Sequence, residues 1–149
     1  MTARNLLLEL GQRLNLGQIE IDPDGTCLLV FDKDLEVEML ADDAKGRLMM
    51  MSWVGYAPHE DREALFRDLL SANLLGRGTG AAVLGFDHLR DMVTLHRDLP
   101  ATTEIEQAVG ALEAFVNYLQ AWRTHLTELA SAAPETAQAD TAMPFGLRA

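Results

Sequence analysis

A long amphipathic helix near the end of the sequence is the feature that most constrains the fold. Large apolar residues recur at intervals of three and four between residues 105 and 129, the spacing of one face of an α-helix. The stripe runs for about seven turns, or roughly 40 Å. Thr103 and Glu106 form a capping-box pattern at its start. The stripe consists of Ile105, Val109, Leu112, Phe115, Leu119, Trp122, Leu126 and Leu129.

Shorter patterns precede this helix and predict the remaining elements. Apolar stripes predict helices over 3–15 and 59–75. The strand patterns are joined by short polar turns, which favour antiparallel pairing. The predicted order is α-β-β-β-α-β-β-α, an α+β fold with an antiparallel sheet. The predicted strands cover 27–31, 35–39, 48–54, 81–86 and 92–97.

Length and charge limit the number of domains and the class of partner. The 149 residues suggest one domain over 1–130, followed by a flexible C-terminal tail over 131–149, where the periodicity is lost. The net charge of −11 argues against nucleic acid and against an anionic membrane surface as partners. The single cysteine excludes a disulfide within the chain, and the N-terminus does not resemble a signal peptide. A cytoplasmic protein is expected.

Three glycines in the stretch ANLLGRGTGAAV, residues 72–83, raise the question of a phosphate-binding loop. Such a loop follows a strand and opens a helix, whose N-terminus faces the anion. Here a helix precedes the glycines and a strand follows them, and no lysine lies nearby. We therefore predict that Gly76 ends the helix in a left-handed conformation and that Gly78 and Gly80 turn the chain into the strand.

The other reactive side chains form no catalytic or metal-binding pattern. The histidines are scattered, and the acidic cluster lacks the glutamate that completes a calcium loop. Cys27 lies within an apolar strand run and is expected to be a small buried hydrophobe. We predict no cofactor, no metal site and no catalytic activity. The histidines are His59, His88, His96 and His125, and the acids are Asp22, Asp24, Asp32, Asp34, Glu36 and Glu38.

The methionine run Met49-Met50-Met51 alternates between the two faces of a predicted strand. Half of the run is expected in the core. The other half is expected to form adaptable exposed surface, because methionine suits binding to varied partners. The pattern favours a binding protein.

Several stretches, taken in order, resemble the class I chaperones of bacterial type III secretion, the Tir chaperone (CesT-like) family. The most specific is ALFRDLLSANLLGRGTGAAVLGFDHLRDMVTLHRDLP, residues 64–100, in which a leucine-rich helix leads into two strands. LLLELGQRLNLG, DPDGTCLLVFD and FVNYLQAWRTHL also fit. The resemblance covers about residues 3–130.

The resemblance implies a homodimer in the cytoplasm of a Gram-negative bacterium, with no catalysis. Such chaperones bind the N-terminal region of one or more effector proteins in extended form and keep them soluble and competent for secretion. The secretion ATPase is a candidate further partner. The alternative is a binding module of the same fold outside secretion, such as a regulator or an assembly factor.

The resemblance also implies two sets of contact residues. Every one of them has an alternative role in the core, and the register that decides which sheet face is exposed stays open. The implied dimer interface is Leu65, Leu69, Leu74, Leu84 and Phe86. The implied effector-binding residues are Leu7, Leu8, Leu14, Val30, Met49 and Met51.

Overall fold

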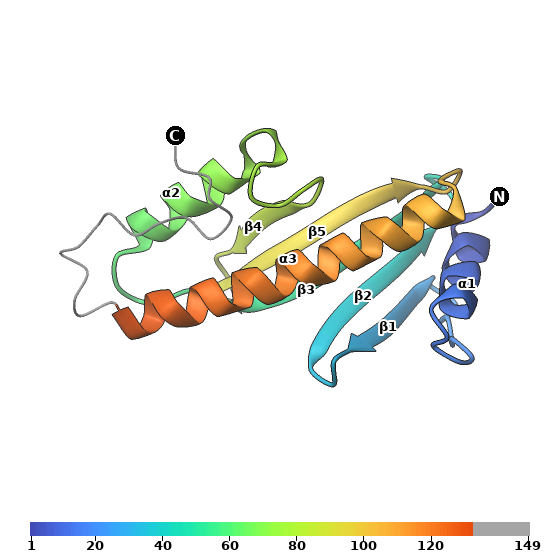
Figure 1. Ribbon diagram of the computed structural model, residues 1–149, viewed down its shortest axis with the longest axis horizontal. Helices are drawn as coiled ribbons and strands as arrows, with labels where there is room; N and C mark the ends of the chain where they lie inside the picture. Colours follow the sequence, from blue (N-terminus) through green and yellow to red (C-terminus); the bar gives the residue numbers. More distant parts are fainter. Residues whose placement is uncertain (133–149) are drawn as a thin grey trace. The chain divides into compact units, whose positions relative to one another are not determined.

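The computed structural model describes residues 1–132 and contains the predicted elements in the predicted order (Figure 1). Its five strands form one sheet in the order β1-β2-β3-β5-β4, so β1 and β4 are the edges. The predicted α+β class is confirmed. From residue 133 onward, the predicted tail lies outside the described residues. The elements are α1 (Ala3–Arg13), β1 (Thr26–Phe31), β2 (Leu35–Asp42), β3 (Arg47–Tyr56), α2 (Arg62–Asn73), the 3-10 turn η1 (Leu74–Gly76), β4 (Val83–Asp87), β5 (Met92–Pro100) and α3 (Ile105–Ala132).

The chain divides into two compact units. Unit 1 consists of residues 1–52 and 96–116, and unit 2 of residues 53–95 together with the chain from Asn117. Unit 1 contains α1 and the β1–β2 hairpin, whereas unit 2 contains α2 and the β4–β5 turn. The elements β3, β5 and α3 pass through both units.

The strands of unit 1 pair antiparallel and sort their side chains onto two faces. Residues 26–31 of β1 pair with residues 35–40 of β2, and residues 38–42 of β2 pair with residues 47–51 of β3. Since successive side chains of a strand point to opposite faces, one face is buried and the other is open to solvent. The buried face carries Cys27, Leu29, Leu35, Val37, Met39, Leu48 and Met50.

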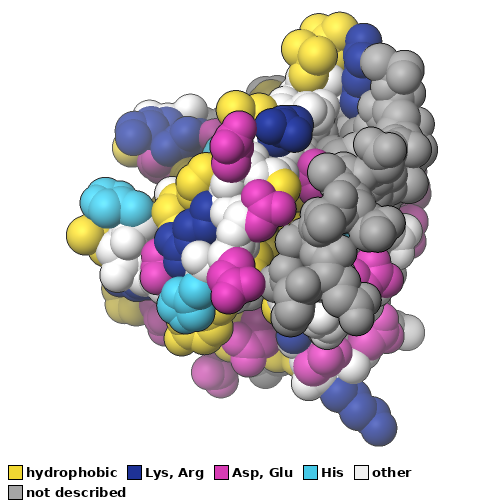
Figure 2. All heavy atoms as spheres, turned by 90° about the vertical axis from the view of Figure 1, so that its left-hand side faces the viewer, with side chains coloured by type: hydrophobic (Ala, Val, Ile, Leu, Met, Phe, Trp, Pro, Cys, Tyr) yellow, Lys and Arg dark blue, Asp and Glu magenta, His cyan; other side chains and the backbone are white. Residues whose placement is uncertain are grey.

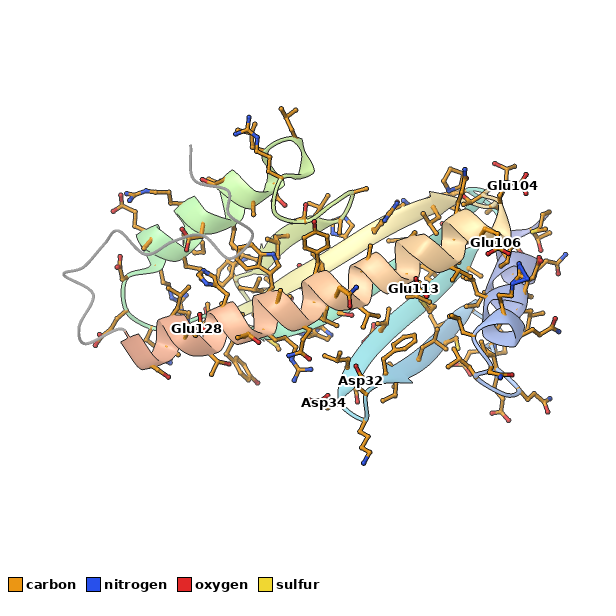
Figure 3. All side chains as sticks on the ribbon, in the orientation of Figure 1. Asp32, Asp34, Glu104, Glu106, Glu113 and Glu128 are labelled. Carbon is orange, nitrogen blue, oxygen red and sulfur yellow. The ribbon has the colours of Figure 1, made fainter. Side chains whose placement is uncertain are left out.

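The turn between β1 and β2 is tight and acidic. Asp32 and Lys33 have positive φ angles of 50° and 73°. The backbone N–H of Asp34 donates to the carbonyl of Phe31 at 3.2 Å. Asp32 and Asp34 lie at the tip of this hairpin (Figure 3), where their carboxylates are exposed.

Helix α1 packs against β2 and fixes the loop that follows it. Its apolar face, including Leu6, Leu7 and Leu10, is fully buried. The N–H of Leu16 donates to the carbonyl of Gly11 at 3.0 Å, so the chain folds back on the helix. A Cβ at Gly11 would overlap the side chain of Ile19, so the glycine permits this close approach.

Helix α2 of unit 2 is shorter at its start than the predicted range of 59–75, and it begins at Arg62. Asp61 has φ 53° and ψ 47°, a left-handed conformation that cannot continue an α-helix. The Nε of Arg62 also donates to the carbonyl of Pro58 at 3.0 Å and holds the chain in this bend. At the other end, Gly76 has the predicted left-handed conformation, with φ 68°.

The glycine loop is held against the part of α3 that belongs to unit 2. The buried indole N–H of Trp122 donates to the carbonyl of Gly78 at 2.9 Å. Gly80 has φ 63°, and a Cβ there would lie 3.1 Å from the ring of Tyr118. These contacts give the glycines a structural role in closing the turn.

Helix α3 begins at Ile105, later than the capping-box pattern at Thr103 predicts. The Thr103 hydroxyl donates to the carbonyl of Pro100 at 2.6 Å and so belongs to the preceding turn. In unit 2, the buried His125 of α3 has its Nε2 3.1 Å from Oδ2 of Asp68 on α2. Within unit 1, an ion pair joins Arg13 to Glu106 at the start of α3 (Figure 3).

Asn73, the last residue of α2, takes the place of a neighbouring strand beside β4. Its Nδ2 donates to the carbonyl of Leu84 at 2.9 Å, and its Oδ1 accepts the N–H of Leu84 at 2.8 Å. Both main-chain groups of Leu84 are therefore satisfied by one side chain, which closes this point of the sheet edge.

Replacing Asn73 with aspartate tests this closure. The carboxylate keeps the acceptor for the Leu84 N–H but places an oxygen against the Leu84 carbonyl, where no donor remains. We expect Asn73→Asp to lower the free energy of unfolding by about 1–3 kcal/mol, measured by urea denaturation. The exposed Asn117→Asp is the matched control and should change it by less than about 0.5 kcal/mol. Equal losses in both variants would contradict the role of Asn73.

Candidate functional site

The open face of the unit 1 sheet presents apolar side chains next to carboxylates. On β1, Leu28 is 53% exposed and Val30 is 48% exposed. The register places Leu28 opposite Glu38 and Val30 opposite Glu36. Both glutamates are exposed. The result is a mixed surface in which each exposed apolar residue of the edge strand has an acidic neighbour.

Two hollows flank β1. The first, of about 450 Å³, lies over the open face, and Leu28, Leu40, Met49 and Met51 give it an apolar lining beside Glu38. The second, of about 360 Å³, is lined by residues 27–30 of β1 and by residues 16 and 18–20 of the loop after α1. Since Cys27 and Leu28 line both hollows, the two adjoin at the edge strand.

The main chain of β1 is open along part of this edge. The N–H of Ala41 donates to the carbonyl of Gly25 at 2.9 Å, which identifies Gly25 as a residue that faces β2. Because hydrogen bonding alternates along an antiparallel pair, Cys27 and Leu29 also face β2, whereas the N–H and C=O groups of Leu28 and Val30 point away from it. Within residues 1–132, no group hydrogen-bonds to the outward groups of these two residues.

At the Thr26 end, the open stretch is closed by local bonds. The carbonyl of Thr26 accepts the N–H of Asp22 at 2.9 Å, and the N–H of Thr26 donates to the Asp24 carboxylate at 3.2 Å. At the opposite edge of the sheet, in unit 2, Asn73 occupies the groups of Leu84. Unpaired strand edges pair readily with other chains, so Leu28 to Val30 is a place where an extended peptide can add a strand.

The electrostatics of the region favour binding over covalent chemistry. Burial raises the pKa of the Cys27 thiol, and the negative charge of Asp22 raises it further, so the nucleophilic thiolate is disfavoured. The hydroxyl of Thr26 donates to Asp24 at 2.7 Å and lowers the pKa of that carboxyl group. Among the described residues, no group of histidine, cysteine and carboxylate side chains could hold a metal ion.

The predicted effector-binding residues fall into three groups. Val30, Met49 and Met51 line the hollows beside β1. Leu8 is 40% exposed on α1 and Leu14 is half-buried. Leu7 is fully buried in the packing of α1, so its side chain is not available to a partner.

The structure adds candidate contact residues that the sequence did not single out. Leu28 lies two residues before Val30, and Leu40 pairs with Met49, so both belong to the open face. The signal for Leu28 was the spacing of two from Val30. This spacing is not informative in the sequence, because the run from Cys27 to Phe31 is almost wholly apolar and does not show which residues face outward.

The predicted dimer residues lie in unit 2, and most of them pack within the chain. Leu65, Leu69 and Leu84 are at most 5% exposed. Phe86 is half-buried, with its ring centroid 5.0 Å from that of Phe66. Leu74 alone of the five is a large exposed apolar residue. Other exposed apolar residues of α2, η1 and β4 are Leu70, Leu75 and Val83.

The surface in Figure 2 mixes basic and acidic side chains with apolar ones. In unit 2, Arg62 pairs with Asp91 at 2.9 Å, and Arg90 pairs with Asp87 at 2.8 Å. These guanidinium groups hold the pKa of each aspartate below its usual value. Both arginines are therefore paired with carboxylates of the same unit. No helix in the part of the chain that the structure describes has the length and apolar character needed to cross a bilayer.

The sequence from residue 5 to residue 123 matches the Tir chaperone protein (CesT) family. The chain belongs to this family. A protein of Chlamydia pneumoniae, CPj0713/CpB0740, is 26% identical over 108 residues, which cover 72% of this chain and 82% of the relative.

Solved structures of related complexes share the fold. A chain of the ExsC–ExsE complex superposes with a TM-score of 0.67 at 26% identity, covering 83% of this chain and 92% of that one. The complex of the Yersinia pestis type III secretion chaperone SycH with a fragment of YscM2 gives 0.64 at 24% identity, covering 79% and 97%. The HopA1–SchA chaperone–effector complex gives 0.64 at 20% identity, covering 81% and 92%.

Amide hydrogen exchange measured by NMR tests the open edge. The N–H groups of Leu28 and Val30 face away from β2, whereas those of Cys27 and Leu29 face it. We expect the first pair to exchange faster than the second, because they lack a main-chain acceptor. Leu29 is the internal control, since it lies between the two open residues. Equal protection of Leu28, Leu29 and Val30 would show that the edge is closed.

Proposed function

We propose that this family member is a cytoplasmic type III secretion chaperone that binds the N-terminal region of one or more effectors in extended form. It would keep the bound segment soluble and competent for secretion, without chemical turnover. The observation that carries the proposal is the open main chain of Leu28 and Val30 between two hollows. The complexes of the related chaperones support the same class of partner. The secretion ATPase is a candidate second partner.

Strand addition at β1 is the binding mode that this geometry supports best. An extended peptide would bond to the outward N–H and C=O groups of Leu28 and Val30, and its alternate side chains would enter the two hollows. Met49 and Met51 line the hollow over the open face, and their flexible side chains can adjust to different partners.

The proposed homodimer would use the exposed apolar surface of α2 and η1. Leu70 and Leu74 are four residues apart and therefore share one face, with 72% and 54% exposure. Leu75 is 85% exposed and has a positive φ of 55°, a strained conformation for leucine. Leu65 and Leu69, which the family resemblance implies for the interface, are buried and would support this surface from within the unit.

A double substitution tests this dimer interface. Leu70→Asp with Leu74→Asp places charges on an exposed face, so the fold should persist while association is lost. We expect sedimentation of the variant as a monomer with unchanged circular dichroism. Leu89→Asp, at another exposed position of unit 2, is the control and should remain dimeric. A dimeric double variant would place the interface elsewhere.

Capture of the natural partner tests the effector-binding site. Val30→Pro removes an outward N–H at an edge strand, where proline is tolerated, whereas Val30→Thr keeps that N–H and the branched shape. In tagged pull-downs from the source bacterium, we expect Val30→Pro to lower recovery at least about fivefold, the effect of one lost hydrogen bond. Val30→Thr should recover nearly as much as the native chain.

The identity and protection of the captured polypeptides complete the test. Mass spectrometry and limited proteolysis should find one or a few polypeptides protected only over an N-terminal segment. Recovery of a folded partner alone under secreting conditions would contradict the export role and favour a regulator or an assembly factor of the same fold. Equal recovery by Val30→Pro and Val30→Thr would contradict strand addition at this edge.

A further inference from the structure

The arrangement around β1 also specifies the chemistry of the segment that would bind there. Resting on the proposed function, we infer that this segment alternates apolar residues with lysine or arginine. The two faces of the sheet have different surroundings at the open edge.

On the inner face, an added strand meets a hollow whose lining mixes apolar and polar groups. The residue opposite Leu29 would share its face and point toward the hollow at the edge of β1. Leu16 and Ile19 of the loop after α1 line this hollow together with Leu29. Gln18 and Glu20 share this lining. An apolar side chain packed on Leu16, Ile19 and Leu29 would remove their surface from water, so an apolar residue is favoured opposite Leu29.

On the outer face, the added strand meets the exposed side chains of Leu28 and Val30. The residues opposite them point to the same face, and β2 lies about 10 Å away, twice the spacing between strands. A lysine or arginine stem can lie across Leu28 or Val30 and extend its charged end toward Glu38 or Glu36. The register places each glutamate directly behind one of these two apolar residues.

The two glutamates remain available for such pairing. In the described residues, neither forms an ion pair with a basic side chain. Two basic residues of unit 1 are engaged elsewhere: Arg47 pairs with Asp98 at 2.7 Å, and Arg13 pairs with Glu106. The net charge of −11 would also attract a basic segment before contact.

Synthetic peptides provide the test on the full-length protein. Three peptides of about nine residues, long enough for one strand, share the same alternating valines and differ only in the intervening residue, which is lysine, glutamine or glutamate. Affinity is measured by NMR titration of the isotope-labelled chain. The amide shifts of residues 28–30 report whether a peptide binds at the proposed edge.

Charge-reversed variants separate local recognition from general attraction. Glu36→Lys with Glu38→Lys changes the charge beside the edge. Glu60→Lys with Glu128→Lys makes the same change in net charge at two exposed positions of unit 2, one of which is labelled in Figure 3. We expect the native chain to bind the lysine peptide about tenfold more tightly than the glutamine peptide, the effect of two partly exposed ion pairs. The preference should persist in the control and reverse toward the glutamate peptide in the edge variant.

Each other outcome has a distinct meaning. If the lysine and glutamine peptides bind equally and both shift residues 28–30, the inference is overturned while the proposed edge site stands. If the lysine preference survives in Glu36→Lys with Glu38→Lys, the attraction is not local and the inference also fails. If no peptide shifts residues 28–30, the edge is not the binding site, and the proposed mode of effector binding fails with it.

Discussion

The antiparallel register of β1, β2 and β3 is the constraint on which the rest of the site depends. Pairing Leu28 with Glu38 and Val30 with Glu36 fixes which side chains can be buried, because a strand repeats every two residues. The same pairing that places Leu29, Val37 and Met50 in the core must expose their neighbours. A shift of the register by one residue would bury the glutamates and expose the core residues. The packing of the core therefore determines which residues form the surface proposed for a partner.

The two edges of the sheet differ in how their main-chain groups are satisfied. At β4, the side chain of Asn73 bonds to both the N–H and the carbonyl of Leu84, so Asn73 occupies the place of a neighbouring strand. At β1, the loop after α1 reaches Gly11 and lines a hollow, but it forms no hydrogen bond with Leu28 or Val30 within residues 1–132. This asymmetry leaves β1 as the edge at which we propose that a partner strand is added.

The sequence was sufficient for the element order, because each helix and strand has its own periodicity and short polar turns separate the strands. It was less informative where local geometry interrupts a pattern: Asp61 adopts a left-handed conformation that delays α2, and Thr103 bonds backward to Pro100. Among candidate contact residues, Met49 and Met51 could be proposed from alternation. The exposure of Leu28 and the burial of Leu7 could not be predicted, since uniformly apolar runs do not reveal which side is covered by another element.

The open stretch of β1 is also short, and this length limits self-association through the edge when no partner is bound. Only two residues offer outward main-chain groups, and each hydrogen bond contributes a net of only about 0.5–1.5 kcal/mol. Two identical edges meeting in solution would gain few such bonds while bringing together two strongly acidic chains, so mutual repulsion opposes fibril-like stacking. Without a bound partner, the chaperone can therefore keep this strand unpaired without aggregating. A partner chain must make side-chain contacts as well as main-chain hydrogen bonds in order to remain bound.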